Sequence, residues 1–286
     1  MIKKFTKSES GVVGIVVAVL LIGLIVAVVS LIQAVYVPKW MEEMEAEHMD
    51  LVVTQFTQLK SAIDTQVANE QPLTPIASPI TLGNKELPYL MSLRAYGSLE
   101  ILSKKYSITV NSNSDNQLNE SFGIIKYTSM NGYFIDQSFI YENGAFITSQ
   151  REGNMLSMKP SISIDKNTSN VTITFNMINI TPVGGKTNGG GYGTTSILTE
   201  YNNTLPDRKN YSEIHNVTNI IISTSYPNAW KIFLEWSLNE NNVNFTKAES
   251  GIVDKGVKIT FTNPDEITLK YKIVEIYAQI GPGWVE

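Results

Sequence analysis

The closest approach to a chemical motif is the glycine-rich run from Gly184 to Gly193. Its Gly185-Lys186-Thr187 step matches the end of the phosphate-binding pattern G-x-x-x-x-G-K-S/T, in which backbone N–H groups and a lysine hold phosphates. That pattern requires glycine at a position where this chain has Ile180, and no strong helix follows to direct its N-terminus at a phosphate. The run is therefore predicted to be a flexible loop between strands.

Histidines and carboxylates form no recognisable catalytic or metal-binding pattern. His48 and His215 lie far apart, without the short spacing of metal ligands or a nearby G-x-S-x-G nucleophile motif, and both are predicted at the surface. The acidic residues between Glu42 and Asp50 are expected on a solvated helix face. The chain has no cysteine, which removes thiolate metal sites, thiol nucleophiles and disulfides. We therefore predict no enzyme activity, no metal and no cofactor.

Composition disfavours two further classes of function. The formal net charge is -5, and lysine or arginine cluster only at the N-terminal tip, so we predict no nucleic-acid partner. An extracellular hydrolase that uses acidic residues is disfavoured because no carboxylates pair at a recognisable spacing.

A long uncharged run, Gly11 to Val37, decides the predicted location of the protein. As a helix it reaches roughly 40 Å, more than the roughly 30 Å hydrocarbon core of a bilayer. It is about twice as long as the apolar region of a cleaved secretory signal, so it should remain as a transmembrane helix over residues 11–37. Lysines precede it and acidic residues follow it, which places the N-terminus in the cytoplasm and residues after about 38 outside. We predict a single-pass cell-membrane protein in contact with lipid, with Tyr36 and Trp40 at the headgroup layer.

Small residues recur four apart along this run and allow helices to approach closely in lipid. They predict packing against like helices through Gly14, Ala18, Gly23, Ala27, Ser30 and Ala34.

An amphipathic stalk helix is predicted over residues 38–70, with a kink or short break near residues 34–38 because of Pro38. Its apolar stripe must be buried under the chain's own globular domain or against neighbouring copies. The predicted stripe comprises Trp40, Met44, Leu51, Val52, Phe56, Leu59, Ile63 and Val67.

Prolines mark residues 71–88 as an extended linker or edge segment, and short β-branched and aromatic runs then fill residues 89–286. The fold class predicted is α+β, with a β-rich, antiparallel sandwich-like extracellular domain behind the helix. Asn143-Gly144 predicts a tight hairpin. Residues 227–239 are ambiguous and favour a helix slightly, with Trp230 and Trp236 both in the core.

Asparagine-rich sequence after residue 110 contains many N-x-S/T acceptor patterns, whose density agrees with a glycosylated surface domain. The glycosylation candidates are Asn119, Asn167, Asn170, Asn179, Asn202, Asn210, Asn216 and Asn244.

The N-terminus, from Lys3 through Lys7 and Ser8-Glu9-Ser10-Gly11 into Val12-Val13-Gly14, resembles the class III signal of archaeal type IV pilin-like proteins. The segment Gln55 to Asp64 and the later Tyr141-Glu142-Asn143-Gly144-Ala145 are similar to a group of uncharacterised archaeal pilin-like surface proteins. The resemblance implies that residues 1–10 are a leader and processing region, which a prepilin peptidase trims on the cytoplasmic side.

Cleavage would then fall after Ser8 or after Ser10, next to Glu9 or Gly11. A cut after Ser8 puts Val13 at the fifth mature position, where bacterial pilins carry a glutamate that neutralises a neighbour's new amino terminus. The exterior is also large for a major archaeal pilin, so a minor or tip subunit, or a pilin-derived surface protein that never polymerises, fits better.

The resemblance therefore implies a structural or adhesive pilin-like surface protein whose partners are like pilin subunits. The alternative is a non-polymerising single-span surface glycoprotein that binds a carbohydrate or a protein through exposed aromatic residues such as Tyr192 and Tyr201.

Overall fold

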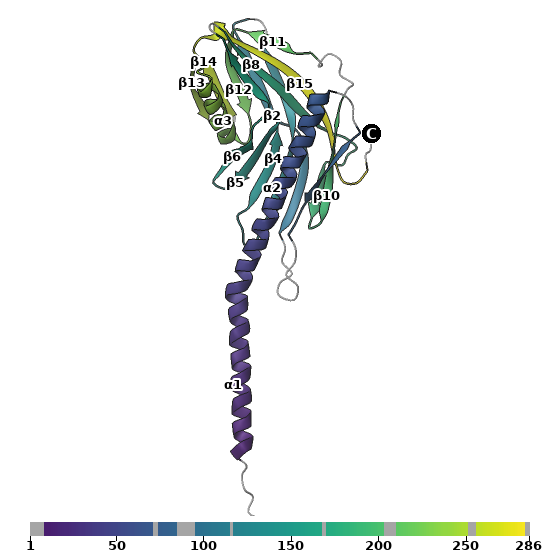
Figure 1. The fold of residues 1–286 in the computed structure, drawn as a ribbon, viewed down its shortest axis with the longest axis vertical. Coiled ribbons are helices and arrows are strands. Elements are labelled where there is room, and N and C mark those ends of the chain that lie inside the picture. Colours follow the sequence, from purple (N-terminus) through teal and green to yellow (C-terminus); the bar gives the residue numbers. More distant parts are fainter. Residues whose placement is uncertain are drawn as a thin grey trace, which may run out of the picture.

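A helical rod leads into a β-rich head, as Figure 1 shows, and the α+β class predicted from the sequence is confirmed. The computed structural model describes residues 9–70, 74–84, 95–114, 117–167, 170–202, 210–250 and 256–283.

The rod is one helix that changes its winding once. It consists of α1 (Glu9–Leu31), a π-helical turn (Ile32–Tyr36) and α2 (Val37–Asn69). The Val37 N–H donates to the Ile32 carbonyl, five residues back, and Pro38 follows without an N–H to offer the preceding turn. The predicted break near residues 34–38 is thus a π turn beginning slightly earlier, and the rod changes direction there without interruption (Figure 1).

The head contains the short helix α3 (Pro227–Glu240) and many strands. The strands are β1 (Ile76–Thr81), β2 (Tyr96–Ser112), β3 (Leu118–Met130), β4 (Gln137–Glu142), β5 (Ala145–Gln150), β6 (Gly153–Met158), β7 (Ile162–Lys166), β8 (Val171–Pro182), β9 (Asn188–Gly191), β10 (Thr194–Tyr201), β11 (Ser212–His215), β12 (Val217–Ser223), β13 (Phe245–Ser250), β14 (Gly256–Phe261) and β15 (Ile267–Ile280).

The described strands form two sheets that face each other. One has the order β1-β10-β15-β8-β7, with β11 beside β15, and the other the order β13-β14-β12-β2-β3-β4-β5-β6, with β9 beside β2. Pairing is antiparallel except between β8 and β15, which run parallel. Gly123 of β3 lies where the two sheets approach each other closely, because a Cβ there would stand 2.0 Å from the Ile180 carbonyl oxygen of β8.

One sequence prediction changes at this level, and for another the structure selects one of the two alternatives. The glycine-rich run is not simply a flexible loop, since Asn188–Gly191 pair with β2 as β9. In the segment predicted as a linker or an edge, Ile76–Thr81 are β1, the edge strand beside β10. The Asn143-Gly144 hairpin is confirmed, with φ angles of 51° and 76° at its two turn residues, both in the left-handed region that a primed turn requires.

Two hydrophobic clusters fill the head. One lies between the sheets and α3, where Trp230 is completely buried. The other lies between the sheets and α2, around Phe56. Residues 227–239 are helical as predicted, but only one of the two tryptophans is core: Trp236 is 46% exposed, with the Lys159 ammonium 3.4 Å from its ring centre.

Candidate functional site: the bare rod and the seat of the stalk

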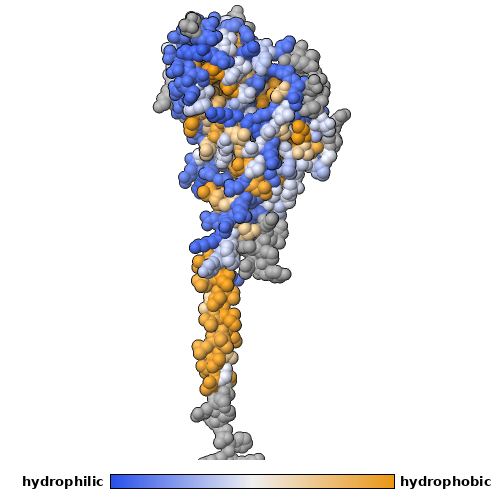
Figure 2. Space-filling view, in the orientation of Figure 1, coloured by the Kyte–Doolittle hydropathy of each residue, from blue (hydrophilic) through white to orange (hydrophobic). Residues whose placement is uncertain are grey.

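The rod below the head carries exposed apolar side chains on every side. From Val13 to Leu31 its large side chains are exposed, and Figure 2 shows this part of the rod as a continuous hydrophobic column below a hydrophilic head. Apart from the neighbouring backbone of the helix itself, no atom of the described residues lies within 4 Å of a Cβ placed on Gly14 or Gly23. Within the described residues, this is the one helix long and apolar enough to cross a membrane.

The stalk α2 packs against the head of its own chain through an apolar stripe. We call this interface between α2 and the head the seat of the stalk. Phe56 is 1% exposed, and its ring centre lies 6.3 Å from that of Tyr127, 6.0 Å from that of Phe139 and 5.7 Å from that of Phe146. The other fully covered apolar residues of the stripe are Met41, Met49, Val52, Leu59 and Ile63. Trp40 and Leu51, which the sequence placed in the stripe, are 40% and 46% exposed. The stripe is therefore covered within one chain.

Glu45 makes the strongest polar contact of this seat. Its carboxylate is 1% exposed and accepts three backbone N–H groups of the loop after β3, from Gly132 at 3.0 Å, Tyr133 at 2.7 Å and Phe134 at 2.7 Å. Hydrogen bonds to a charged group are among the strongest in proteins. The prediction of a uniformly solvated acidic face is therefore wrong at Glu45, although Glu42, Glu43, Glu47 and Asp50 are exposed.

Glu45→Gln is expected to lower the free energy of unfolding by about 3 kcal/mol, because an amide presents one acceptor oxygen and one N–H donor to three N–H donors. Denaturant unfolding of the detergent-solubilised chain measures this loss, and hydrogen exchange at Gly132 to Phe134 should localise it. Glu43→Gln, at an exposed position, is the matched control. Equal stability of the two variants would contradict the role assigned to Glu45.

His48 is also part of the seat, so the prediction that it lies at the surface is wrong. It is 5% exposed, and its Nε2 lies 3.0 Å from the Tyr127 hydroxyl, which donates to the Leu82 carbonyl at 2.8 Å. Burial lowers the pKa of His48, opposed by a hydrogen bond to Leu82 and by the charge of Glu45. Burial also raises the pKa of Tyr127 to about 12. Burial therefore favours the neutral form of the imidazole.

Further polar contacts fix the stalk along its length. The Gln55 side chain donates to the Thr81 hydroxyl at 2.9 Å and accepts the Thr81 N–H at 2.8 Å. The Gln66 amide donates to the Thr199 carbonyl at 2.6 Å, and Glu70 pairs with Lys272 at 2.5 Å. Together with the contacts of Glu45 and His48, these contacts are spaced from residue 45 to residue 70, and sliding the helix by one turn would break all of them. The seat therefore fixes the register of the rod relative to the head.

A second buried carboxylate, Glu142, links the β4–β5 hairpin to α3. It is 1% exposed and accepts hydrogen bonds from the Thr224 hydroxyl and the Trp230 Nε1, each at 2.7 Å. Burial raises its pKa to about 7, although both hydrogen bonds act in the opposite direction. Both hydrogen bonds reach the same carboxylate oxygen, and Glu142 does not line the groove described below.

Glu142 should make the stability of the head depend on pH. The folded pKa of about 7 lies above the ordinary value of 4.5. The contribution of Glu142 to the free energy of unfolding is therefore complete below pH 4.5 and is lost as the pH rises toward 7. The loss is roughly 3 kcal/mol at most. In Glu142→Gln this slope should disappear. Denaturant unfolding of both proteins at pH 4.5, 6 and 8 measures it; parallel pH profiles would contradict the assignment.

The remaining candidates for chemistry, Lys186 and His215, form hydrogen bonds at the surface of the head. The Lys186 ammonium donates to the Pro282 carbonyl at 3.1 Å, and the preceding Gly184-Gly185 pair is a turn with φ angles of 65° and 68°. His215 is exposed, as predicted, and its Nδ1 lies 3.1 Å from the Thr268 hydroxyl. No group of three metal-ligating residues comes together within the described part of the chain. The absence of enzyme activity stays a prediction.

The glycosylation candidates differ in accessibility. Asn119, Asn167, Asn170, Asn210 and Asn244 are exposed, and Asn216 is half-buried in a turn with a φ of 57°. Asn202 is 8% exposed, and the Asn179 side chain accepts the Gly123 N–H at 2.9 Å and donates to Thr181 at 3.3 Å. Asn202 and Asn179 are therefore poor acceptors in the folded chain.

The processing candidates lie at the start of α1. Ser8 is outside the described residues, while Glu9, Ser10 and Gly11 are helical in their backbone.

The comparisons with known proteins place this chain in a family. The chain belongs to the family of unknown function DUF7289, which matches residues 10–276 and so includes rod, stalk and head. No curated protein and no solved structure matches the chain.

Proposed function

We propose that the protein is a pilin-like surface protein, held in the membrane by α1 and carrying its head outside the cell. The observation that supports it most is the apolar rod, exposed on every side and joined in fixed register to a hydrophilic head. Leaving such a column in water would cost about 25 cal/mol for each Å² of apolar surface, so it requires lipid or other helices. The basic tip at Lys3, Lys4 and Lys7 supports a cytoplasmic N-terminus.

The rod is the part of the chain that this proposal assigns to self-association. Because the head already covers the stripe of α2, neighbouring copies would meet through α1, whose small residues leave open space at Gly14 and Gly23. In this role the protein would be a minor or tip subunit of a pilus-like filament, with the heads as a structural or adhesive coat. Its partners would be lipid, a prepilin peptidase and like subunits.

Replacing Gly14 and Gly23 with leucine should weaken crosslinking between copies in native membranes, because a leucine keeps two backbones apart. The control replaces Val17 and Val28, which are exposed on the same rod, with leucine. Crosslinking that is equally strong in both variants would contradict a helical core.

N-terminal mass spectrometry of the membrane protein tests processing directly. A chain that starts at Glu9 or Gly11 supports pilin-type trimming, and an intact Met1 supports a plain anchor.

A second candidate, a non-polymerising glycoprotein that binds a carbohydrate or a protein, is favoured by one exposed aromatic pair. Tyr96 and Tyr192 are 39% and 49% exposed, and their ring centres lie 5.6 Å apart in an edge-to-face arrangement. Tyr201, also considered from the sequence, is 6% exposed and does not contribute. This candidate predicts an unprocessed N-terminus and no crosslinking between rods.

A further inference from the structure

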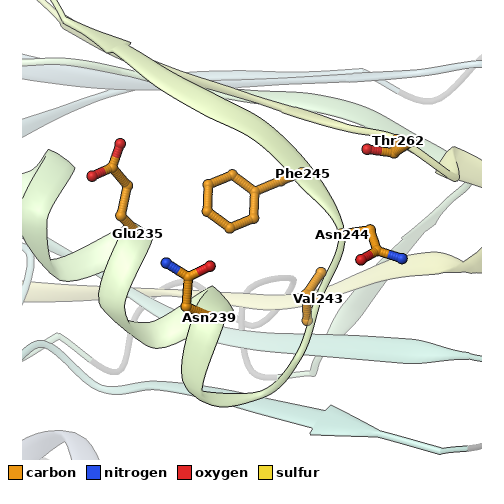
Figure 3. Close-up of a pocket in the computed structure, with 6 residues that line it drawn as sticks. All are labelled: Glu235, Asn239, Val243, Asn244, Phe245 and Thr262. Atoms are coloured by element: carbon orange, nitrogen blue, oxygen red, sulfur yellow. The ribbon is translucent and has the colours of Figure 1, made fainter.

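An open groove of about 560 Å³ lies between the end of α3 and the beginning of β13. Figure 3 shows the Phe245 ring at its centre, with Glu235 and Asn239 of α3 on one side of the ring and Asn244 and Thr262 on the other. Val243 closes the apolar wall beside Phe245. The groove thus combines one aromatic surface with several side chains that can form hydrogen bonds.

The lining favours a neutral, hydroxyl-rich ligand. One carboxylate oxygen of Glu235 is buried and has no hydrogen-bond partner, a situation that is costly unless a donor arrives. Phe245 is half-buried and offers part of its ring, while Asn239 and Thr262 are exposed. A sugar has both features that match, since its C–H face can pack on an aromatic ring and its hydroxyl groups can donate to a carboxylate. An anion such as phosphate would be repelled by Glu235.

The chain itself offers the attachment point for such a sugar. Asn244, on the rim of the groove, begins the acceptor pattern Asn244-Phe245-Thr246, so the acceptor amide and the aromatic surface are adjacent residues. Asn244 is exposed, and its backbone is fixed because its carbonyl accepts the Thr262 N–H at 3.2 Å. The Val243 N–H donates to the Leu238 carbonyl at 3.0 Å, which fixes the loop against α3.

We propose that this groove holds an N-linked glycan attached to Asn244, whose first sugars pack on Phe245 and form hydrogen bonds with Glu235 and Asn239. The inference rests on the proposed function, since it requires the head to be exported. It gives the glycan a structural role as well. β13 is the edge strand of the larger sheet, and an exposed strand edge invites pairing with other chains. A glycan seated at the start of β13 would hold α3 against it and cover that edge.

The test compares Thr246→Ala, which destroys the acceptor pattern, with Thr246→Ser, which keeps it; Thr246 is exposed, so neither change disturbs the core. Protein purified from the membranes of its native cells is analysed by glycopeptide mass spectrometry and by hydrogen exchange. We expect a saccharide on Asn244 in wild type and Thr246→Ser. In Thr246→Ala we expect exchange in the peptide 235–240 to rise on the order of fivefold.

Two further variants distinguish packing of the glycan in the groove from the mere presence of a glycan on the protein. Phe245→Ala should retain the glycan and still show the faster exchange, because the packing surface is gone. Ser212→Ala, which removes the acceptor pattern at Asn210, should leave exchange at 235–240 unchanged.

A bare Asn244 in exported protein would overturn the inference and leave the proposed function intact. So would a modified Asn244 with equal exchange in Thr246→Ala and Thr246→Ser. Protein retained in the cytoplasm would overturn both.

Discussion

Replacing Leu20 and Ile25 with arginine is expected to release the protein from the membrane fraction. Both side chains lie in the middle of the bare rod and are 67% and 61% exposed, so each arginine would face lipid. A charge at the centre of a membrane helix costs about 2.5 to 3.5 kcal/mol on insertion scales, so two cost about 6 kcal/mol. That shifts the partition between membrane and water by about four orders of magnitude. Carbonate extraction of membranes followed by immunoblotting measures it.

The control for this experiment replaces the same two residues with alanine, which shortens the side chains without adding charge. This variant should remain in the membrane. If the double-arginine protein sediments with membranes as the alanine variant does, α1 is not what holds the protein there.

Phe56→Ala should be the most damaging single change in the seat of the stalk, with a loss of about 3 to 5 kcal/mol in the free energy of unfolding. The ring is 1% exposed and lies among Tyr127, Phe139 and Phe146, so its removal leaves a cavity that rigid β-strands cannot fill. Denaturant unfolding of the detergent-solubilised chain measures the loss. Limited proteolysis should cut α2 sooner, because the stalk leaves its seat more often.

Leu51→Ala is the matched control on the same helix, since Leu51 is 46% exposed. It should change stability by less than about 1 kcal/mol. If Phe56→Ala were as mild as Leu51→Ala, the stalk would not be seated as described.

The rod could be predicted from the sequence because composition alone decides it: an uncharged run of this length has few stable environments. The hairpin at Asn143-Gly144 was predictable for a similar local reason, since few residue pairs accept two positive φ angles in succession. The stripe of α2 was only partly predictable. Helical spacing identified Phe56, Leu59 and Ile63, but the direction of the head decides that Met41 and Met49 are covered and Leu51 is not.

The polar anchors of the stalk were beyond sequence reasoning. Glu45 and His48 resemble their solvated neighbours in type and spacing, and only the loop at Gly132 to Phe134 and the Tyr127 hydroxyl, far away in sequence, bury them. The prediction for Trp236 was wrong in the opposite sense, since it was expected in the core and is exposed. An aromatic residue on a short helix can lie on either face. The groove beside Asn244 likewise exists only once α3 packs against β13.

Single-cysteine labelling of intact cells tests the central claim, that α1 lies in lipid while the head faces outward. The chain has no cysteine, so Ile22→Cys in the rod and Met155→Cys on the head, at sites 62% and 60% exposed, each carry one reactive thiol. We predict that a membrane-impermeant maleimide labels Met155→Cys at once and Ile22→Cys only after the protein is denatured. Rapid labelling of Ile22→Cys in intact cells, or protection of Met155→Cys until the cells are broken, would contradict the account.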